Sequence, residues 1–302
     1  MTDNELKPIV IIGATATGKS SLGIKLAADN GEIVSGDSMQ IYRRMDIGTA
    51  KPDKSQLSAV RHHLIDIADI DEPFSAERFL TLAKEAISGI VSRGRRPVLV
   101  GGTGFYIESL ISGVEFAKAE GDKELRESLF KKAETLGPEA LYEELKKADP
   151  ESAAAIHPNN VKRVVRALEL LSVTGKTKTE LNAASKKNAK PLDCDVIYLS
   201  YGSRDDLYAK INARVDKMFG DGLEDEVRSL WEDGLEDTPT ASQAIGYKEF
   251  FPYFKGALSL DEVKENIKQA TRNYAKRQET YFNRMANIYG NIKKTEPENP
   301  KC

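Results

Sequence analysis

The sequence predicts an α/β fold, a parallel sheet flanked by helices and interrupted by a helical insertion. Three observations lead to this prediction. Apolar runs typical of buried parallel strands alternate with helical patterns. A glycine-rich loop follows the first apolar run and opens a helix, as in P-loop NTPase-like sheets. The alternation stops between residues 113 and 192, so we expect a core of residues 1–112 and 193–292 with a helical insertion domain of residues 113–192.

The individual elements follow from local patterns. Five apolar runs are the expected strands, at residues 9–12, 32–35, 64–67, 97–100 and 195–200. Helical periodicity predicts a helix over residues 76–91, one over residues 160–172 within the insertion, and one that begins at Arg204. The polar tail of residues 293–302 carries two prolines and is predicted to be disordered.

The most informative motif follows the first expected strand. It reads Gly13, Ala14, Thr15, Ala16, Thr17, Gly18, Lys19, Ser20 and matches the phosphate-binding pattern G-x-x-x-x-G-K-[ST]. The glycines let backbone amides surround a phosphate at the start of a helix. Lys19 would supply a point charge, and Ser20 would hold Mg²⁺. The motif therefore predicts a site for a phosphate chain, without saying which compound carries it.

Polar residues also follow other expected strands, at the sheet edge where ligands bind in α/β proteins. Asp37 would face the phosphate loop, either as a general base or as an indirect partner of Mg²⁺, and an Asx turn or helix cap is the alternative. In the glycine-rich segment of residues 101–104, Thr103 would place a hydroxyl at the site, unless the segment is only a tight packing turn. Asp66 fits either a Walker-B acid or a turn.

Charge is distributed unevenly along the chain. The net charge of −3 does not indicate a nucleic-acid-binding protein, but residues 160–190 hold eight basic and two acidic side chains. A second basic stretch covers residues 268–284, and a solvated helix face is the alternative for both stretches. Arg204, Lys210 and Arg214 are candidate pyrophosphate contacts, each with a surface cation as its alternative.

Several classes of protein are excluded. The two cysteines, Cys194 and Cys302, form no C-x-x-C pattern, which argues against a disulfide scaffold and a cysteine zinc site. No apolar run approaches the ~20 residues of a membrane span, and the polar N-terminus lacks a signal-peptide core. We therefore expect a reduced, cytoplasmic protein that does not contact membranes.

Taken together, the motifs resemble those of the tRNA dimethylallyltransferases, also called isopentenyl-tRNA transferases. The matching segments are residues 13–20, 37–43, 48–52, 101–106, 163–169, 214–216, 222–223, 244–249 and 271–282. Four positions depart from the family pattern: Ala14 replaces proline, Thr17 serine, Phe105 leucine and Tyr281 tryptophan. None of these changes removes a charge or hydroxyl group that the chemistry needs.

The resemblance implies an activity and a set of site residues. The family transfers a dimethylallyl group from dimethylallyl diphosphate to N6 of the adenine on the 3′ side of the anticodon, with Mg²⁺ as cofactor. Asp37, Thr15 and Thr103 are then catalytic, and Arg204 joins the phosphate loop in binding the diphosphate. The insertion would bind the anticodon stem of a tRNA. We expect the protein to be a monomer. The implied tRNA contacts are Asp37, Ser38, Met39, Gln40, Thr103, Arg126, Lys162, Arg163, Val164, Val165 and Arg166.

Two other functions remain as alternatives. A small-molecule P-loop kinase would also place an acid after the second strand, although we find no arginine-paired lid segment. A non-catalytic RNA-binding P-loop protein would keep all its properties when Asp37 is replaced. Within the prenyltransferases, an adenosine-phosphate isopentenyltransferase is disfavoured by the long basic insertion.

Overall fold

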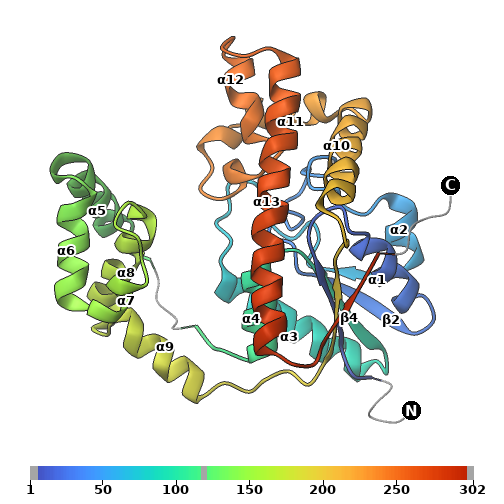
Figure 1. The fold of residues 1–302 in the computed structure, drawn as a ribbon, viewed down its shortest axis with the longest axis horizontal. Coiled ribbons are helices and arrows are strands. Elements are labelled where there is room, and N and C mark those ends of the chain that lie inside the picture. Colours follow the sequence, from blue (N-terminus) through green and yellow to red (C-terminus); the bar gives the residue numbers. More distant parts are fainter. Residues whose placement is uncertain (1–5, 117–120, 298–302) are drawn as a thin grey trace. The chain divides into compact units, whose positions relative to one another are not determined.

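The computed structural model describes residues 6–116 and 121–297 (Figure 1). The chain forms two compact units, one of residues Met1–Ile111 and Leu192–Cys302 and a second of residues Ser112–Pro191. The expected insertion of residues 113–192 differs from the second unit by one residue at each boundary.

The first unit is built on a parallel sheet. Its strand order is β3-β2-β4-β1-β5-β6, and every neighbouring pair within the described residues is parallel. The strands are β1 (Ile9–Gly13), β2 (Gly31–Ser35), β3 (His62–His63), β4 (Arg96–Gly101), β5 (Asp195–Leu199) and β6 (Ile292–Thr295). The predicted α/β class with a parallel sheet is confirmed.

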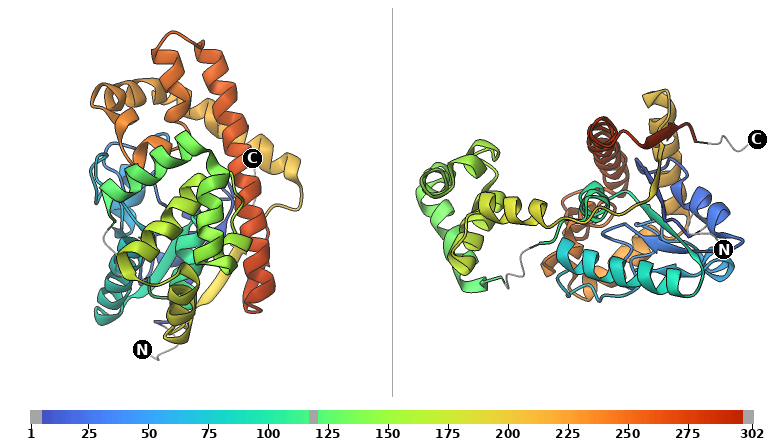
Figure 2. Two further views of the ribbon diagram at one scale, coloured as in Figure 1. Left: turned by 90° about the vertical axis from the view of Figure 1, so that its left-hand side faces the viewer. Right: turned by 90° about the horizontal axis from the view of Figure 1, so that it is seen from below.

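Helices of the first unit pack against this sheet. The helix α1 contacts β1 and β4, α3 contacts β2 and β4, and the long α13, seen end-on in the right view of Figure 2, contacts β1. Ile9 and Ile11 of β1 share a core cluster with Ala27 of α1, because successive residues of a strand point to opposite faces and residues two apart therefore share a face. The helices are α1 (Lys19–Ala27), α2 (Lys54–Ala59), α3 (Ala76–Ser92), α4 (Gly104–Ser112), α10 (Arg204–Gly220), α11 (Leu223–Glu232), α12 (Phe251–Phe254) and α13 (Leu260–Ile288), with short 3₁₀ turns η2 (Leu235–Asp237), η3 (Ala241–Gln243) and η4 (Lys248–Phe250).

The second unit is helical, as predicted. A core cluster that includes Leu141, Leu145 and Ile156 is closed by Val164 and Val165. Asn160 caps the helix that carries these valines, because its side chain accepts a hydrogen bond from the amide of Arg163. The helices are α5 (Lys123–Leu136), α6 (Pro138–Ala148), α7 (Pro150–Ala154), α8 (Val161–Thr174) and α9 (Lys178–Lys187).

Two predictions about elements were wrong. Residues 64–67 are not a strand, because Leu64 and Asp66 take left-handed conformations with φ of 62° and 55°, and the strand there is the shorter β3. The start of the expected disordered tail is instead β6, which pairs in parallel with β5. Its side chains are mostly exposed, as on many edge strands, and this explains the polar sequence. Residues 298–302 of that tail lie outside the described residues.

Across the described part of the chain, each helix is either too short or too polar to span a bilayer.

Candidate active site

A pocket lies in the first unit at the carboxyl ends of β1, β2 and β4. These strands are neighbours in the sheet, so the loops that follow them meet at one edge. The pocket is lined by residues of all three loops, of the segment that contains residues 49–52, and of α10 and α13. The lining residues are Thr15, Lys19, Ser20, Ile33, Ser35, Asp37, Gln40, Thr49, Ala50, Pro52, His62, Ile65, Val100, Gly101, Gly102, Arg214, Tyr274 and Gln278.

The glycine-rich loop after β1 has the geometry of a phosphate cradle. Gly18 has a φ of 80°, and a Cβ at Gly13 would come within 2.5 Å of the carbonyl oxygen of Leu199, so both positions need glycine. The hydroxyl of Thr17 and the Nζ of Lys19 donate to the carbonyl oxygen of Ala14 at 2.8 and 2.7 Å. These bonds hold the loop in shape and aim Lys19 along it.

Two cations face this loop. The pKa of Lys19 is lowered to about 7, chiefly by burial and also by the nearby Arg214, while the carboxylate of Asp37 acts in the opposite direction. Arg214 donates to the hydroxyl of Thr15 at 3.3 Å, and burial lowers its pKa as well, against the influence of Asp37. Two partly exposed cations with lowered pKa values indicate a site that is completed by an anion.

The prediction of Arg204 as a diphosphate contact needs correction. Arg204 is the first residue of α10, its side chain is exposed, and it is not among the residues that line the pocket. Arg214 lies ten residues further along the same helix, about 15 Å along its axis at ~1.5 Å per residue. Of the candidate pyrophosphate contacts Arg204, Lys210 and Arg214, it is Arg214 that lines the pocket.

Asp37 lines the same pocket as the phosphate loop, close enough for its charge to act on Lys19 and Arg214. Its Oδ1 accepts hydrogen bonds from the amides of Met39 at 2.9 Å and Gln40 at 3.4 Å, which is the Asx turn considered as the alternative. The same carboxylate also lines the pocket, so the turn fixes its direction without removing it from the site. The hydroxyl of Thr103 accepts from the amide of Ser38 at 3.0 Å and lies 3.3 Å from its hydroxyl.

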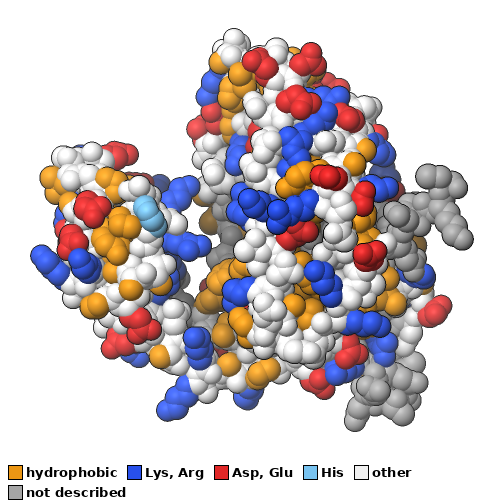
Figure 3. Space-filling view, in the orientation of Figure 1, with side chains coloured by type: hydrophobic (Ala, Val, Ile, Leu, Met, Phe, Trp, Pro, Cys, Tyr) orange, Lys and Arg blue, Asp and Glu red, His pale blue; other side chains and the backbone are white. Residues whose placement is uncertain are grey.

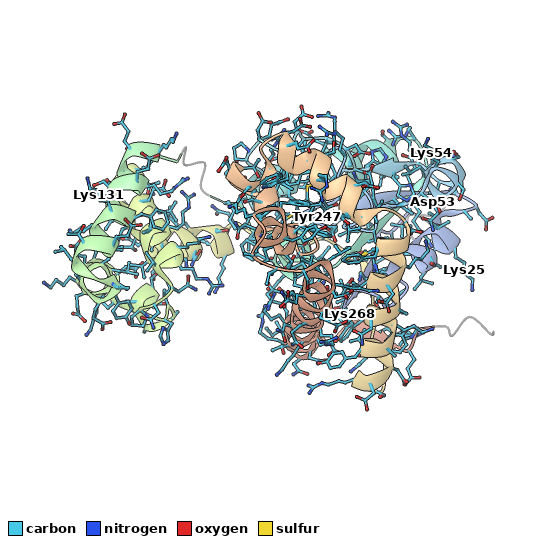
Figure 4. All side chains as sticks on the ribbon, turned by 90° about the horizontal axis from the view of Figure 1, so that it is seen from above. Lys25, Asp53, Lys54, Lys131, Tyr247 and Lys268 are labelled. Carbon is cyan, nitrogen blue, oxygen red and sulfur yellow. The ribbon has the colours of Figure 1, made fainter. Side chains whose placement is uncertain are left out.

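The pocket wall of residues 49–52 is held by a carboxylate that sequence reasoning missed. Glu226 of α11 accepts hydrogen bonds from the amides of Asp46, Ile47 and Gly48 at 3.1, 2.8 and 3.2 Å. It also accepts a hydrogen bond from the hydroxyl of Tyr247 at 2.7 Å, and Tyr247 is labelled in the interior of the first unit in Figure 4. A Cβ at Gly48 would come within 2.4 Å of the Tyr247 ring.

The other side of this wall meets the loop after β2. The side-chain amide of Gln40 donates to the carbonyl oxygens of Thr49 and Ala50, both at 3.2 Å. Its carbonyl oxygen accepts from the hydroxyl of Ser35 at 3.1 Å. Gln40, expected to contact tRNA, thus contacts the wall of the pocket in this structure.

Asp66 does not act as a Walker-B acid in this structure. Its carboxylate pairs with Lys51 at 2.6 Å, and Lys51 also pairs with Asp46 and donates to the carbonyl oxygen of Tyr42 at 2.8 Å. Asp66 is not among the pocket-lining residues. The turn interpretation of Asp66 therefore holds.

Among the described residues, no cluster of three or more His, Cys, Asp or Glu side chains could hold a metal ion. Ser20 is exposed in the pocket at the start of α1, and Asp37 lines the same pocket. Mg²⁺ is commonly held by few protein oxygens together with substrate phosphates, so this donor set fits Mg²⁺ bound along with a diphosphate.

In the second unit, the residues expected to contact tRNA fall into three groups. Lys162 and Arg163 are exposed on α8. Arg126 and Arg166 each pair at 2.7 Å with Glu169, whose side chain is fully buried. Val164 and Val165 were also expected to contact tRNA, but their side chains are buried in the core of the unit. We therefore correct this prediction, because both side chains pack in the core. Lys and Arg side chains also gather over α13 of the first unit (Figure 3).

Comparisons with known proteins identify the family. A model of the IPP transferase family matches residues 40–285. The tRNA dimethylallyltransferase of Geobacillus thermodenitrificans is 50% identical over 277 residues, which are 91% of this chain and 87% of that protein. The full-length tRNA isopentenylpyrophosphate transferase of Bacillus halodurans shares the structure with a TM-score of 0.69 and 41% identity, over 96% of this chain and 90% of that one.

A eukaryotic dimethylallyltransferase acting on tRNA aligns with a TM-score of 0.80 and 33% identity, over 96% of this chain and 74% of that one. The likeness therefore extends beyond the glycine-rich loop to nearly the whole chain. By both sequence and structure, the chain belongs to the IPP transferase family.

Proposed function

We propose that this protein transfers a dimethylallyl group from dimethylallyl diphosphate to N6 of the adenine on the 3′ side of the anticodon in tRNA, with release of diphosphate. The observation that carries the proposal is one pocket with two chemical halves. A phosphate cradle with Lys19 and Arg214 lies on one side, and the carboxylate of Asp37 lies on the other. The relatives with matching structures carry the name of this activity.

The pocket suits a prenyl diphosphate. Its lining includes the apolar side chains of Ile33, Ile65 and Val100 beside the charged groups, and an isoprenoid chain needs such a surface. Backbone amides of the cradle recognise a phosphate chain whatever it is attached to. These features support binding of an allylic diphosphate, whereas nothing in the comparisons supports the small-molecule kinase.

The reaction breaks the bond between C1 of the allyl group and the diphosphate oxygen, and forms a bond between C1 and N6. Negative charge grows on the diphosphate as it leaves, and the loop amides, Lys19 and Arg214 balance that charge. Asp37 accepts a hydrogen bond from the exocyclic amine, orients its lone pair and takes its proton. Thr15 and Thr103 position the two reacting partners. Mg²⁺ held by Ser20 would neutralise further charge on the diphosphate.

The acceptor is proposed to be the anticodon stem-loop of a tRNA. An adenine must leave its stack to reach a pocket of this kind, as in other enzymes that modify bases. The second unit supplies exposed cations on α8, Lys162 and Arg163, which suit contacts to backbone phosphates. In this scheme, the basic insertion allows a chain of net charge −3 to bind the phosphates of an RNA.

The test is an assay of product. Purified protein, unmodified tRNA, Mg²⁺ and dimethylallyl diphosphate are incubated, and the digested tRNA is analysed by mass spectrometry for N6-isopentenyladenosine. Asp37→Ala should lower turnover about 100-fold or more, and Asp29→Ala, the same change at an exposed carboxylate, should leave it unchanged. Phosphate transfer from ATP without prenylation would instead establish the kinase.

A further inference from the structure

Gln278 of α13 joins the two halves of the pocket. Its side chain is buried, with 5% exposure, and its carbonyl oxygen accepts a hydrogen bond from the amide of Thr15 at 2.8 Å. Its side-chain amide donates to the carbonyl oxygen of Gly102, also at 2.8 Å. Thr15 lies in the loop after β1 and Gly102 in the loop after β4, so one side chain connects the diphosphate loop to the loop that carries Thr103.

The chemistry of this connection is specific to glutamine. One partner is a backbone donor and the other a backbone acceptor, so the bridging side chain must both accept and donate. Glutamate would keep the acceptor and lose the donor, and methionine of similar length would lose both. A Cβ at Gly102 would come within 2.5 Å of the Gln278 nitrogen, so glycine at this position makes room for the bridge.

The bridge formed by the Gln278 side chain occupies one of the two polar groups of Thr15. The amide of Thr15 is used by Gln278, while its hydroxyl lies 3.3 Å from Arg214 on the pocket side. On the other loop, Gly102 directly precedes Thr103, whose hydroxyl accepts from the amide of Ser38 beside Asp37. The diphosphate loop and the acceptor loop follow two strands that pair directly, β1 and β4, and Gln278 adds a side-chain connection between them beyond the end of that pairing.

We propose that Gln278 is a positioning residue for prenyl transfer, which sets the separation between the donor carbon and the acceptor amine. This inference rests on the proposed function. Reacting atoms must approach to about 3–3.5 Å with aligned orbitals, so a small change in the spacing of the two loops costs rate more than affinity. Gln278 acts through the two loops and is not required to touch either substrate.

The experiment compares Gln278→Met and Gln278→Glu with Gln269→Met and Gln269→Glu, the same changes at an exposed glutamine on the same helix. The kcat and KM values are measured with unmodified tRNA, the Kd for dimethylallyl diphosphate is measured without tRNA, and Tm reports folding. We expect kcat of both Gln278 variants to fall about 10-fold or more, with Kd for the diphosphate within about threefold of the wild type. The Gln269 variants should match the wild type.

The outcomes separate this inference from the proposed function. If the wild type forms no N6-isopentenyladenosine, the proposed function fails. If the wild type is active, the inference is overturned when kcat of the Gln278 variants equals that of the Gln269 variants. It is equally overturned when kcat, donor affinity and Tm all fall together, or when both variants unfold, because Gln278 would then serve only to hold the fold.

Discussion

The lowered pKa of Lys19 predicts that diphosphate binding takes up a proton. In the free site, burial and the nearby Arg214 together lower this pKa from its usual 10.5 to about 7, against the influence of Asp37. At pH 8 roughly a tenth of the Lys19 side chains are then protonated. A bound diphosphate favours the charged form and raises the pKa again. Binding at pH 8 should therefore take up about 0.9 proton per site.

The pH dependence follows from the same linkage. Below about pH 6, Lys19 is protonated in both states and the affinity does not depend on this group. As pH rises above 7, the free site must gain a proton to bind, so affinity should fall by up to about tenfold per pH unit. The decline should end where the pKa of the bound state is reached.

Isothermal titration calorimetry of dimethylallyl diphosphate at pH 8, in buffers of different ionisation enthalpy, measures this uptake directly. Lys19→Arg is the control, because a guanidinium stays protonated and any remaining uptake comes from the ligand or other groups. The difference between wild type and variant isolates Lys19. Equal proton uptake in the two proteins would show that Lys19 is already charged in the free site and would refute the reasoning.

Three further predictions concern the pocket wall and the insertion. Gly48→Ala should lower the free energy of unfolding by about 1–3 kcal/mol in urea titrations, because the new Cβ overlaps the Tyr247 ring; no change would mean that the ring moves freely. Glu226→Gln should lower kcat/KM about 10-fold or more in the prenylation assay, since it weakens the acceptor of three amides, and full activity would exclude this anchor. The double change of Lys162 and Arg163 to glutamate should weaken tRNA binding and flatten its salt dependence in filter-binding assays while the Kd for dimethylallyl diphosphate stays constant; unchanged tRNA affinity would contradict the role of α8.

The parts of the site that sequence could predict are those made by contiguous residues. The phosphate loop, Asp37 and the glycine-rich loop each follow a strand directly, and the rule that ligands bind at the carboxyl ends of parallel strands brings them together. The helix that begins at Arg204 was also predicted correctly. Sequence could not single out Arg214, which lines the pocket, from Arg204, which does not, because periodicity gives the buried face of a helix but not how far along its axis the phosphate loop lies.

The remaining contacts join residues far apart in the chain. Gln278 is 263 positions from Thr15, and Glu226 is 178 positions from Gly48, so no local pattern connects them. The segments of residues 48–52 and 274–278 are family motifs, but their contacts appear only when α11 and α13 are packed. Edge strand β6 escaped prediction because its exposed lysines are typical of a loop as well as of a protected sheet edge.

Different parts of the chain contribute to different parts of the site. The loops after β1, β2 and β4 carry the residues that we propose for the chemistry, and helices after β5 contact those loops: Arg214 and Gln278 contact Thr15, and Glu226 accepts hydrogen bonds from the amides of residues 46–48. All pocket-lining residues belong to the first unit, whereas the basic face of α8 belongs to the second. Diphosphate affinity and tRNA affinity should therefore respond to different substitutions. Turnover should need both, and we expect it to fall most when Asp37 is replaced and less when Gln278 is replaced.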